Sequence, residues 1–163
     1  MFELPSFPSW DAFHPGISHF PIVLLLVAPV LIIVGLLSPK QRSNLIALAL
    51  WFMLAGTLGV YLSAATGDAA KELAPKTPEV IKAIEDHENI GSIVRVIFTV
   101  LTALLASLQF GPSLLKKQLS SRAFMVLTVL FLLIYVVAAL LLYNAAHSGG
   151  ILVHKLGVHA KIT

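Results

Sequence analysis

The sequence predicts an all-α integral membrane protein, a four-helix bundle that forms a single domain over residues 1–163. The composition is the first reason: 58% of the residues are hydrophobic and 12% are charged, against about half and about a quarter in soluble domains. The second is that four apolar stretches are each long enough to cross a bilayer core, which takes about 20 helical residues. The mean hydropathy of +0.91 agrees with this class.

The four stretches are separated by segments that contain proline, glycine or charged residues. We expect helices at about residues 20–37, 44–65, 78–110 and 123–146, followed by a tail at 147–163. Pro29 lies in the middle of the first stretch, where it removes one backbone hydrogen bond and should kink the helix. Thr77, Pro78 and Glu79 predict the start of the third helix, as an N-cap, a first-turn proline and an acid favoured by the helix dipole.

The basic residues of the two short loops predict the orientation. Residues 38–43 contain two basic side chains and residues 111–122 contain three, and neither loop has an acidic residue. Short loops rich in Lys and Arg stay in the cytoplasm. We therefore expect both termini and the connection at 66–89 on the outer side, which is the periplasm in a Gram-negative cell.

All six histidines fall on the outer side in this topology: His14, His19, His87, His147, His154 and His159. Ionisable groups near membrane depth are functional candidates. The alternative interpretation is that amphipathic rings simply lie at the headgroup interface. The interfacial interpretation fits His159 best.

Helical spacing places His87 on the buried face of the third helix. This face consists of Val80, Ile84, His87, Gly91, Val94 and Phe98. Gly91, one turn below His87, leaves room for a flat ligand or for the backbone of another helix. Arg95 lies about 12 Å deeper than His87 at 1.5 Å per residue. The sequence leaves three ways to satisfy the Arg95 charge. It could pair with Asp68, pair with a haem propionate, or extend to the membrane interface by snorkelling.

The histidines suggest a metal or a metal-containing cofactor. Imidazoles from separate helices can ligate a noncovalent b-type haem from opposite faces, and His19, His87 and His147 lie at three helix ends. His14 is the weakest of four candidates, so we expect one or two haem b groups. The chain has no cysteine, which excludes haem attached through CxxCH. The same histidines could instead hold zinc or copper.

Several of these residues together resemble a known family. The residues that carry the resemblance are His14-Pro15, His19-Phe20-Pro21, Gly67-Asp68, His87, His147-x-Gly149-Gly150 and Leu152-Val153. They are similar to the signature of an uncharacterised family of four-helix bacterial membrane proteins with an HPxxxHFP start and an HxGG end. The resemblance covers nearly the whole chain and implies a place in the bacterial cytoplasmic (inner) membrane and histidines that are suspected haem ligands. His154 stands where the resemblance leads us to expect an aromatic residue, so a ligand role there is doubtful.

The leading hypothesis is a membrane b-type cytochrome that transfers electrons at the outer face through bis-His haem, as an electron carrier rather than a catalyst. Its partners would be the lipid bilayer, a quinone or membrane dehydrogenase, and a periplasmic cytochrome or copper protein. The sequence is also compatible with a homo-oligomer. The second hypothesis is a zinc, copper or proton binding or transport protein that adds Asp68 and Glu88, and the third is a structural membrane subunit. No hydrolase or nucleotide-binding motif is present, and no basic face predicts nucleic-acid binding.

Overall fold

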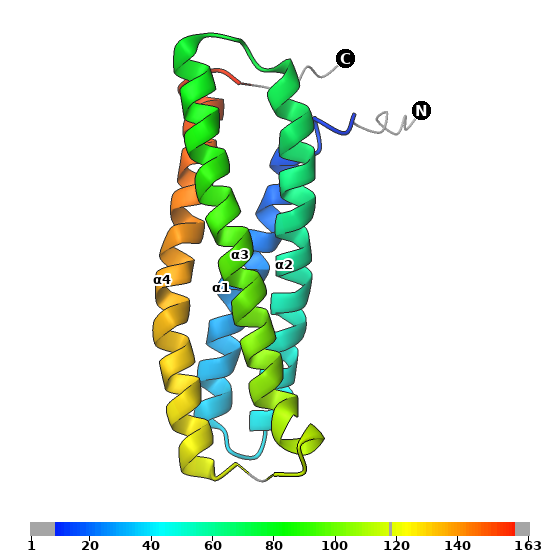
Figure 1. Cartoon of the computed structure of the whole chain (residues 1–163), viewed down its shortest axis with the longest axis vertical. Coiled ribbons are helices and arrows are strands. Elements are labelled where there is room, and N and C mark those ends of the chain that lie inside the picture. The colour runs from blue at the N-terminus through cyan, green and yellow to red at the C-terminus, as the bar shows by residue number, and fades with distance from the viewer. Residues whose placement is uncertain (1–8, 118, 159–163) are drawn as a thin grey trace, which may run out of the picture.

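The computed structural model describes residues 9–117 and 119–158, and within them the chain forms four α-helices. These are α1 (His14–Leu37), α2 (Arg42–Leu73), α3 (Pro78–Leu114) and α4 (Ser121–His154). The helices alternate in direction, each packs against the next in sequence, and α4 closes the bundle against α1 (Figure 1). The start of α1, the α2–α3 connection and the end of α4 share one end of the bundle, called here the connection end.

All four helices are long and apolar enough to cross a membrane. Large apolar side chains also cover the outside of the bundle, among them Leu133, Val136 and Leu140 of α4, which are each more than half exposed. Water does not favour such a surface, whereas lipid chains do. The predicted class of an all-helical, multi-pass membrane protein is therefore confirmed.

The helices extend beyond the apolar stretches that predicted them. α1 begins at His14 instead of about residue 20, α2 continues to Leu73 instead of about 65, and α4 continues to His154 instead of about 146. An apolar run marks the part of a helix that crosses the bilayer core, while the backbone hydrogen bonds continue into more polar sequence. The start of α3 agrees with the prediction, because the Thr77 hydroxyl accepts a hydrogen bond from the Val80 N–H.

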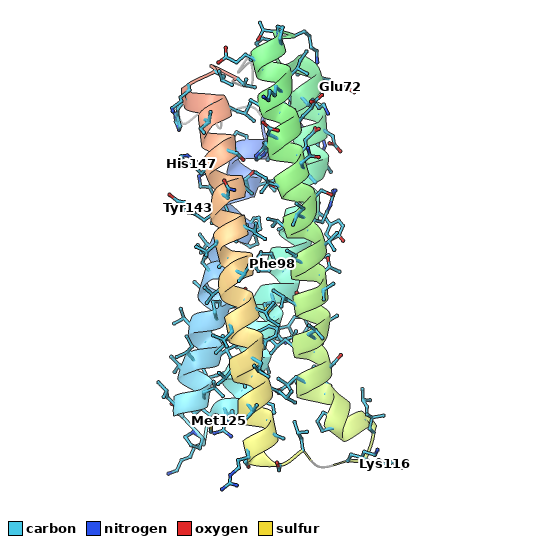
Figure 2. All side chains as sticks on the ribbon, turned by 60° about the vertical axis from the view of Figure 1, so that its left-hand side comes forward. Glu72, Phe98, Lys116, Met125, Tyr143 and His147 are labelled. Atoms are coloured by element: carbon cyan, nitrogen blue, oxygen red, sulfur yellow. The ribbon has the colours of Figure 1, made fainter. Side chains whose placement is uncertain are left out.

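The middle of the bundle is filled by apolar side chains and one buried tyrosine. The rings of Phe98 and Tyr135 meet edge to face, with 5.5 Å between their centroids (Figure 2 labels Phe98). The Tyr135 hydroxyl donates to the Leu25 carbonyl at 2.6 Å. Leu25 is four residues before Pro29, which has no N–H to give this carbonyl. A side chain of α4 therefore satisfies the group that the proline of α1 leaves free.

Glycines bring α1 and α2 close together. A Cβ atom added at Gly56 would lie 2.7 Å from Leu25, and one added at Gly59 would lie 3.1 Å from Pro21. Small residues allow this approach in membrane helices, where close contact replaces the hydrophobic effect as the cause of packing. These glycines of α2 therefore keep α1 packed closely against α2.

Candidate functional site

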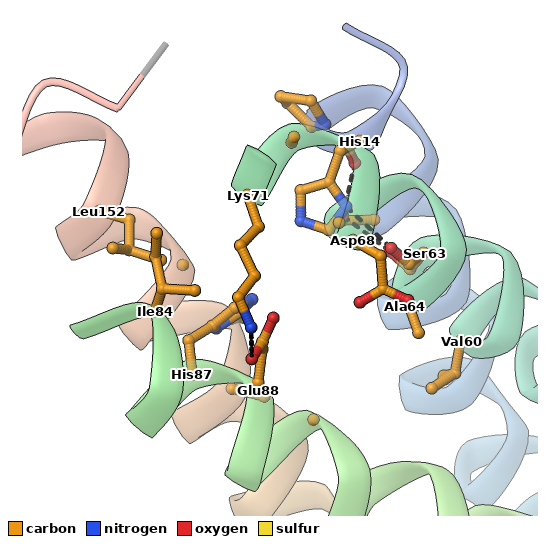
Figure 3. Close-up of a pocket in the computed structure, with 18 of the residues that line it drawn as sticks. His14, Val60, Ser63, Ala64, Asp68, Lys71, Ile84, His87, Glu88 and Leu152 are labelled. Carbon is orange, nitrogen blue, oxygen red and sulfur yellow. Dashed lines mark hydrogen bonds and ion pairs between the residues drawn. The ribbon is translucent and has the colours of Figure 1, made fainter. Parts of the chain in front are cut away.

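A cavity of about 510 Å³ lies inside the bundle toward the connection end, and all four helices contribute to its wall (Figure 3). Its volume is in the range of about 300–1,000 Å³ that small-molecule and cofactor sites occupy. His14 of α1 and His87 of α3 both line it. Val60, Ile84, Val94 and Leu142 supply apolar wall.

Hydrogen bonds from α2 hold the His14 ring. Its Nδ1 lies 2.9 Å from the Ser63 carbonyl oxygen and 3.2 Å from the Thr66 hydroxyl. A carbonyl oxygen can only accept, so Nδ1 carries the proton and donates. The neutral ring then has its lone pair on Nε2, which makes Nε2 the nitrogen available to a ligand.

A serine of α4 holds the His87 ring in the same way. Nδ1 of His87 lies 2.8 Å from the Ser148 hydroxyl, and that hydroxyl donates its own proton to the Ala145 carbonyl at 2.9 Å. Ser148 therefore accepts from the ring, and Nδ1 is again the protonated nitrogen. Both histidines of the cavity therefore have Nε2 as the acceptor nitrogen, and no described residue donates a hydrogen bond to it.

The two rings lie toward each other across the cavity (Figure 3). Their centroids are 6.4 Å apart and their planes are nearly perpendicular, at 82°. Each ring also fits against a glycine on a neighbouring helix. A Cβ atom added at Gly67 would lie 3.1 Å from Cε1 of His14, and one at Gly149 would lie 3.1 Å from Cε1 of His87.

Charged side chains line the cavity around and below the histidine pair. Lys71 and Glu88 form an ion pair at 2.5 Å between α2 and α3, with side chains 45% and 35% exposed (Figure 3). Arg95 lies over the Tyr61 ring, with its guanidinium carbon 5.8 Å from the ring centroid. Asp68 also lines the cavity, but within the described residues it forms no ion pair with Arg95.

The structure pairs the histidines differently from the expectation. His19 and His147 are exposed and do not line the cavity. Nδ1 of His19 bonds to the Pro15 carbonyl in its own helix, and His147 stacks on exposed Tyr143 at 6.3 Å on the outside of α4 (Figure 2). Since α1 already starts at His14, five residues at about 100° each turn His19 some 140° away from His14.

The remaining sequence candidates are also placed. Gly91 lines the cavity, and a Cβ atom added there would meet nothing within 4 Å, so no other backbone packs on it. His154 is exposed at the end of α4. His159 lies outside the described residues.

Three hydroxyl-bearing residues of the site were not predicted from the sequence: Ser63, Thr66 and Ser148. Ser148 occupies the variable position of the HxGG motif, and Ser63 lies between Gly59 and Gly67 on α2. A serine or threonine one or two positions from a conspicuous glycine or histidine carries little signal alone, because such residues are common in membrane helices. Their role depends on which ring the neighbouring helix brings to them.

The arrangement offers two nitrogen donors on opposite sides of a cavity that has both apolar and charged lining residues. In the described ranges 9–117 and 119–158, no group of three or more His, Cys, Asp or Glu side chains is placed to hold a metal ion. Structural and catalytic zinc sites use three or four protein ligands. A metal that needs only two axial protein ligands fits this donor set better.

Comparison with known protein families matches residues 11–162 to the family described as predicted membrane protein (DUF2231). No curated protein and no solved structure shows a significant match to the chain. The family match includes the four helices and every residue of the cavity discussed above. Because it covers nearly the whole sequence, the chain belongs to the DUF2231 family of predicted membrane proteins.

Proposed function

We propose that the protein is a membrane b-type cytochrome that binds one haem between His14 and His87. The observation that carries the proposal is the separation of the two rings. Imidazoles that ligate one iron from opposite faces, with bonds of about 2 Å each, have ring centres about 6 Å apart. The 6.4 Å between the His14 and His87 centroids agrees with this requirement.

The hydrogen bonds at Nδ1 also support haem ligation. Metal-ligating histidines usually donate the other ring N–H to a carbonyl, carboxylate or water, which fixes the tautomer and makes the ligating nitrogen more basic. Ser63 and Thr66 do this for His14, and Ser148 does it for His87. The apolar wall suits a large flat porphyrin, which supplies one-electron redox chemistry when bound.

The number of haems follows from the number of inward histidines. The sequence allowed one or two haem b groups, with His19 and His147 as further ligands. Both side chains are exposed and have partners on their own helices. The proposal is therefore a single haem in each chain. His14, the weakest ligand candidate from the sequence, is one of its two proposed ligands.

The proposed place of the protein is the bacterial cytoplasmic (inner) membrane, with the connection end and the cavity on the outer side. The five basic residues of the two loops at the opposite end support this orientation. Electrons would pass between a quinone or membrane dehydrogenase and a periplasmic cytochrome or copper protein.

Purified protein, expressed with sufficient haem, tests the proposal. We expect a reduced-minus-oxidised spectrum of low-spin haem b and a pyridine haemochromogen value of one haem per chain. His14→Ala and His87→Ala should each lose the low-spin spectrum, because each removes one of two axial nitrogens. His147→Ala is the matched control and should keep both the spectrum and the haem content.

Two results would contradict the proposal. One is the absence of haem bands from a folded wild-type protein. The other is stoichiometric zinc or copper without porphyrin in elemental analysis, which would favour the metal-binding hypothesis instead.

A further inference from the structure

Arg95 has a charge that no ion pair among the described residues neutralises. It is half-buried and lines the cavity two turns along α3 from His87. Its described polar contacts are the Ser92 hydroxyl, 3.4 Å from Nη2, and the face of the Tyr61 ring. The guanidinium stays protonated at any physiological pH, and a charge near membrane depth is costly without a partner.

The contacts of Arg95 hold the guanidinium in place without neutralising it. The Tyr61 hydroxyl lies 3.1 Å from the Thr99 hydroxyl, which donates to the Arg95 carbonyl at 2.7 Å. The aromatic platform on α2 is thereby linked to the helix that carries the arginine. A cation–π contact of this kind contributes attraction but no opposite charge.

The charges along the cavity differ between its two ends. Asp11, Asp68 and Glu88 lie level with the histidine pair or nearer the connection end, and Lys71 there is already paired with Glu88. Among the described residues that line the cavity, Arg95 is the one charged group deeper than the pair. Glu88 is neutralised by the same ion pair, so a carboxylate on a bound ligand would be repelled by Asp11 and Asp68 and attracted to Arg95 at the deep end.

We propose that Arg95 binds a carboxylate of the ligand in the cavity. Resting on the haem proposal, we identify this carboxylate as a propionate directed toward the middle of the bundle. His87 and Arg95 are separated by about 12 Å along α3 at 1.5 Å per residue, a span that an extended arginine and a propionate arm bridge together. Arginine forms two parallel hydrogen bonds with one carboxylate, which makes it well suited to this task.

The test compares two porphyrins that have the same iron and differ only in the carboxylates. Haem-free protein in detergent is titrated with haem and with protohaem dimethyl ester, and absorption gives the two dissociation constants. We expect wild type to bind haem at least about tenfold more tightly than the ester, the strength of a hydrogen-bonded charge. Arg95→Gln should bind the two porphyrins equally, and Arg95→Lys should keep part of the preference.

Lys82→Gln is the matched control, because it removes an exposed cation of α3 that does not line the cavity and should leave the preference intact. Equal binding of both porphyrins by wild type would overturn the role of Arg95 and would favour a lipid phosphate as its partner. A preference that survives in Arg95→Gln, or that disappears in Lys82→Gln, would overturn it as well. Binding of neither porphyrin by wild type would instead refute the haem proposal, and this one with it.

Discussion

Two glycines determine how close the histidine rings of the cavity lie to the neighbouring helices. Gly67 lies against the edge of the His14 ring and Gly149 against the edge of the His87 ring, and a methyl group at either position would come to 3.1 Å from the ring, so that the ring would have to shift. The second glycine of the HxGG motif, Gly150, has no atom within 4 Å of an added Cβ. The motif thus contains one glycine in contact with a ring and one that is free of this constraint.

Gly149→Ala should therefore displace His87, while Gly150→Ala should not. The added methyl group would come to 3.1 Å from Cε1 of a ring whose Nδ1 is hydrogen-bonded to the neighbouring Ser148. Overpacking of this kind costs about 1–3 kcal/mol. Unfolding in denaturant, followed by circular dichroism of the haem-free protein, should show this loss for Gly149→Ala only. Equal stability of the two variants would show that the ring can move away without cost.

At the scale of the element, the residue at which α1 begins decides which of its histidines faces inward. Hydropathy predicts a helix from about Phe20, six residues after His14. The structure continues the helix back to His14, with Pro15 in the first turn, where its missing N–H has no cost. His14 and His19 are then on one helix and point in different directions. Hydropathy reports the part in lipid and carries no information on where the first turn begins.

The bond between Tyr135 and Leu25 offers a second test, on the contact between α4 and α1. Tyr135→Phe should destabilise the protein by about 1–2 kcal/mol, because a buried carbonyl beside Pro29 loses its donor. In a Pro29→Ala background the restored N–H can serve this carbonyl, so the same substitution should cost less. Unfolding free energies of the four proteins in detergent give the coupling. Tyr143→Phe, on the exposed face of α4, is the control with no expected loss. A full cost in both backgrounds would assign the role of Tyr135 to packing alone.

At the scale of the whole molecule, the sequence was sufficient for the class and the number of helices but not for the site. Composition and four apolar stretches indicate a membrane bundle directly. The pairing of His14 with His87 depends on how α1 and α3 are turned about their axes. The rotation of α1 is set by its contacts with α2, such as Gly56 on Leu25 and Gly59 on Pro21, which join residues far apart in the sequence. The residue pattern of one helix does not contain the rotation of a neighbouring helix about its own axis.

The orientation in the membrane is the prediction that belongs to the complete chain. A reporter that works only in the periplasm should be active when it is fused after Thr163, because the basic residues at 38–43 and 111–122 predict that the opposite end is cytoplasmic. Fusion of a cytoplasmic reporter after residue 117 is the complementary measurement and should be active. The reverse pattern would place the cavity on the cytoplasmic side.

The site also divides the chain into two halves that each contain one of its histidines. His14 and the groups that orient it belong to the α1–α2 hairpin, whereas His87 and Ser148 belong to the α3–α4 hairpin. During synthesis the first hairpin enters the membrane before the second exists, so it can hold only half of the pair. The pair forms when the second hairpin docks, and a ligand that bridges both imidazoles would then stabilise the docked state over separated hairpins. Ligand binding would then distinguish correctly docked chains from misassembled ones, because only a docked chain has both imidazoles in place to retain the ligand.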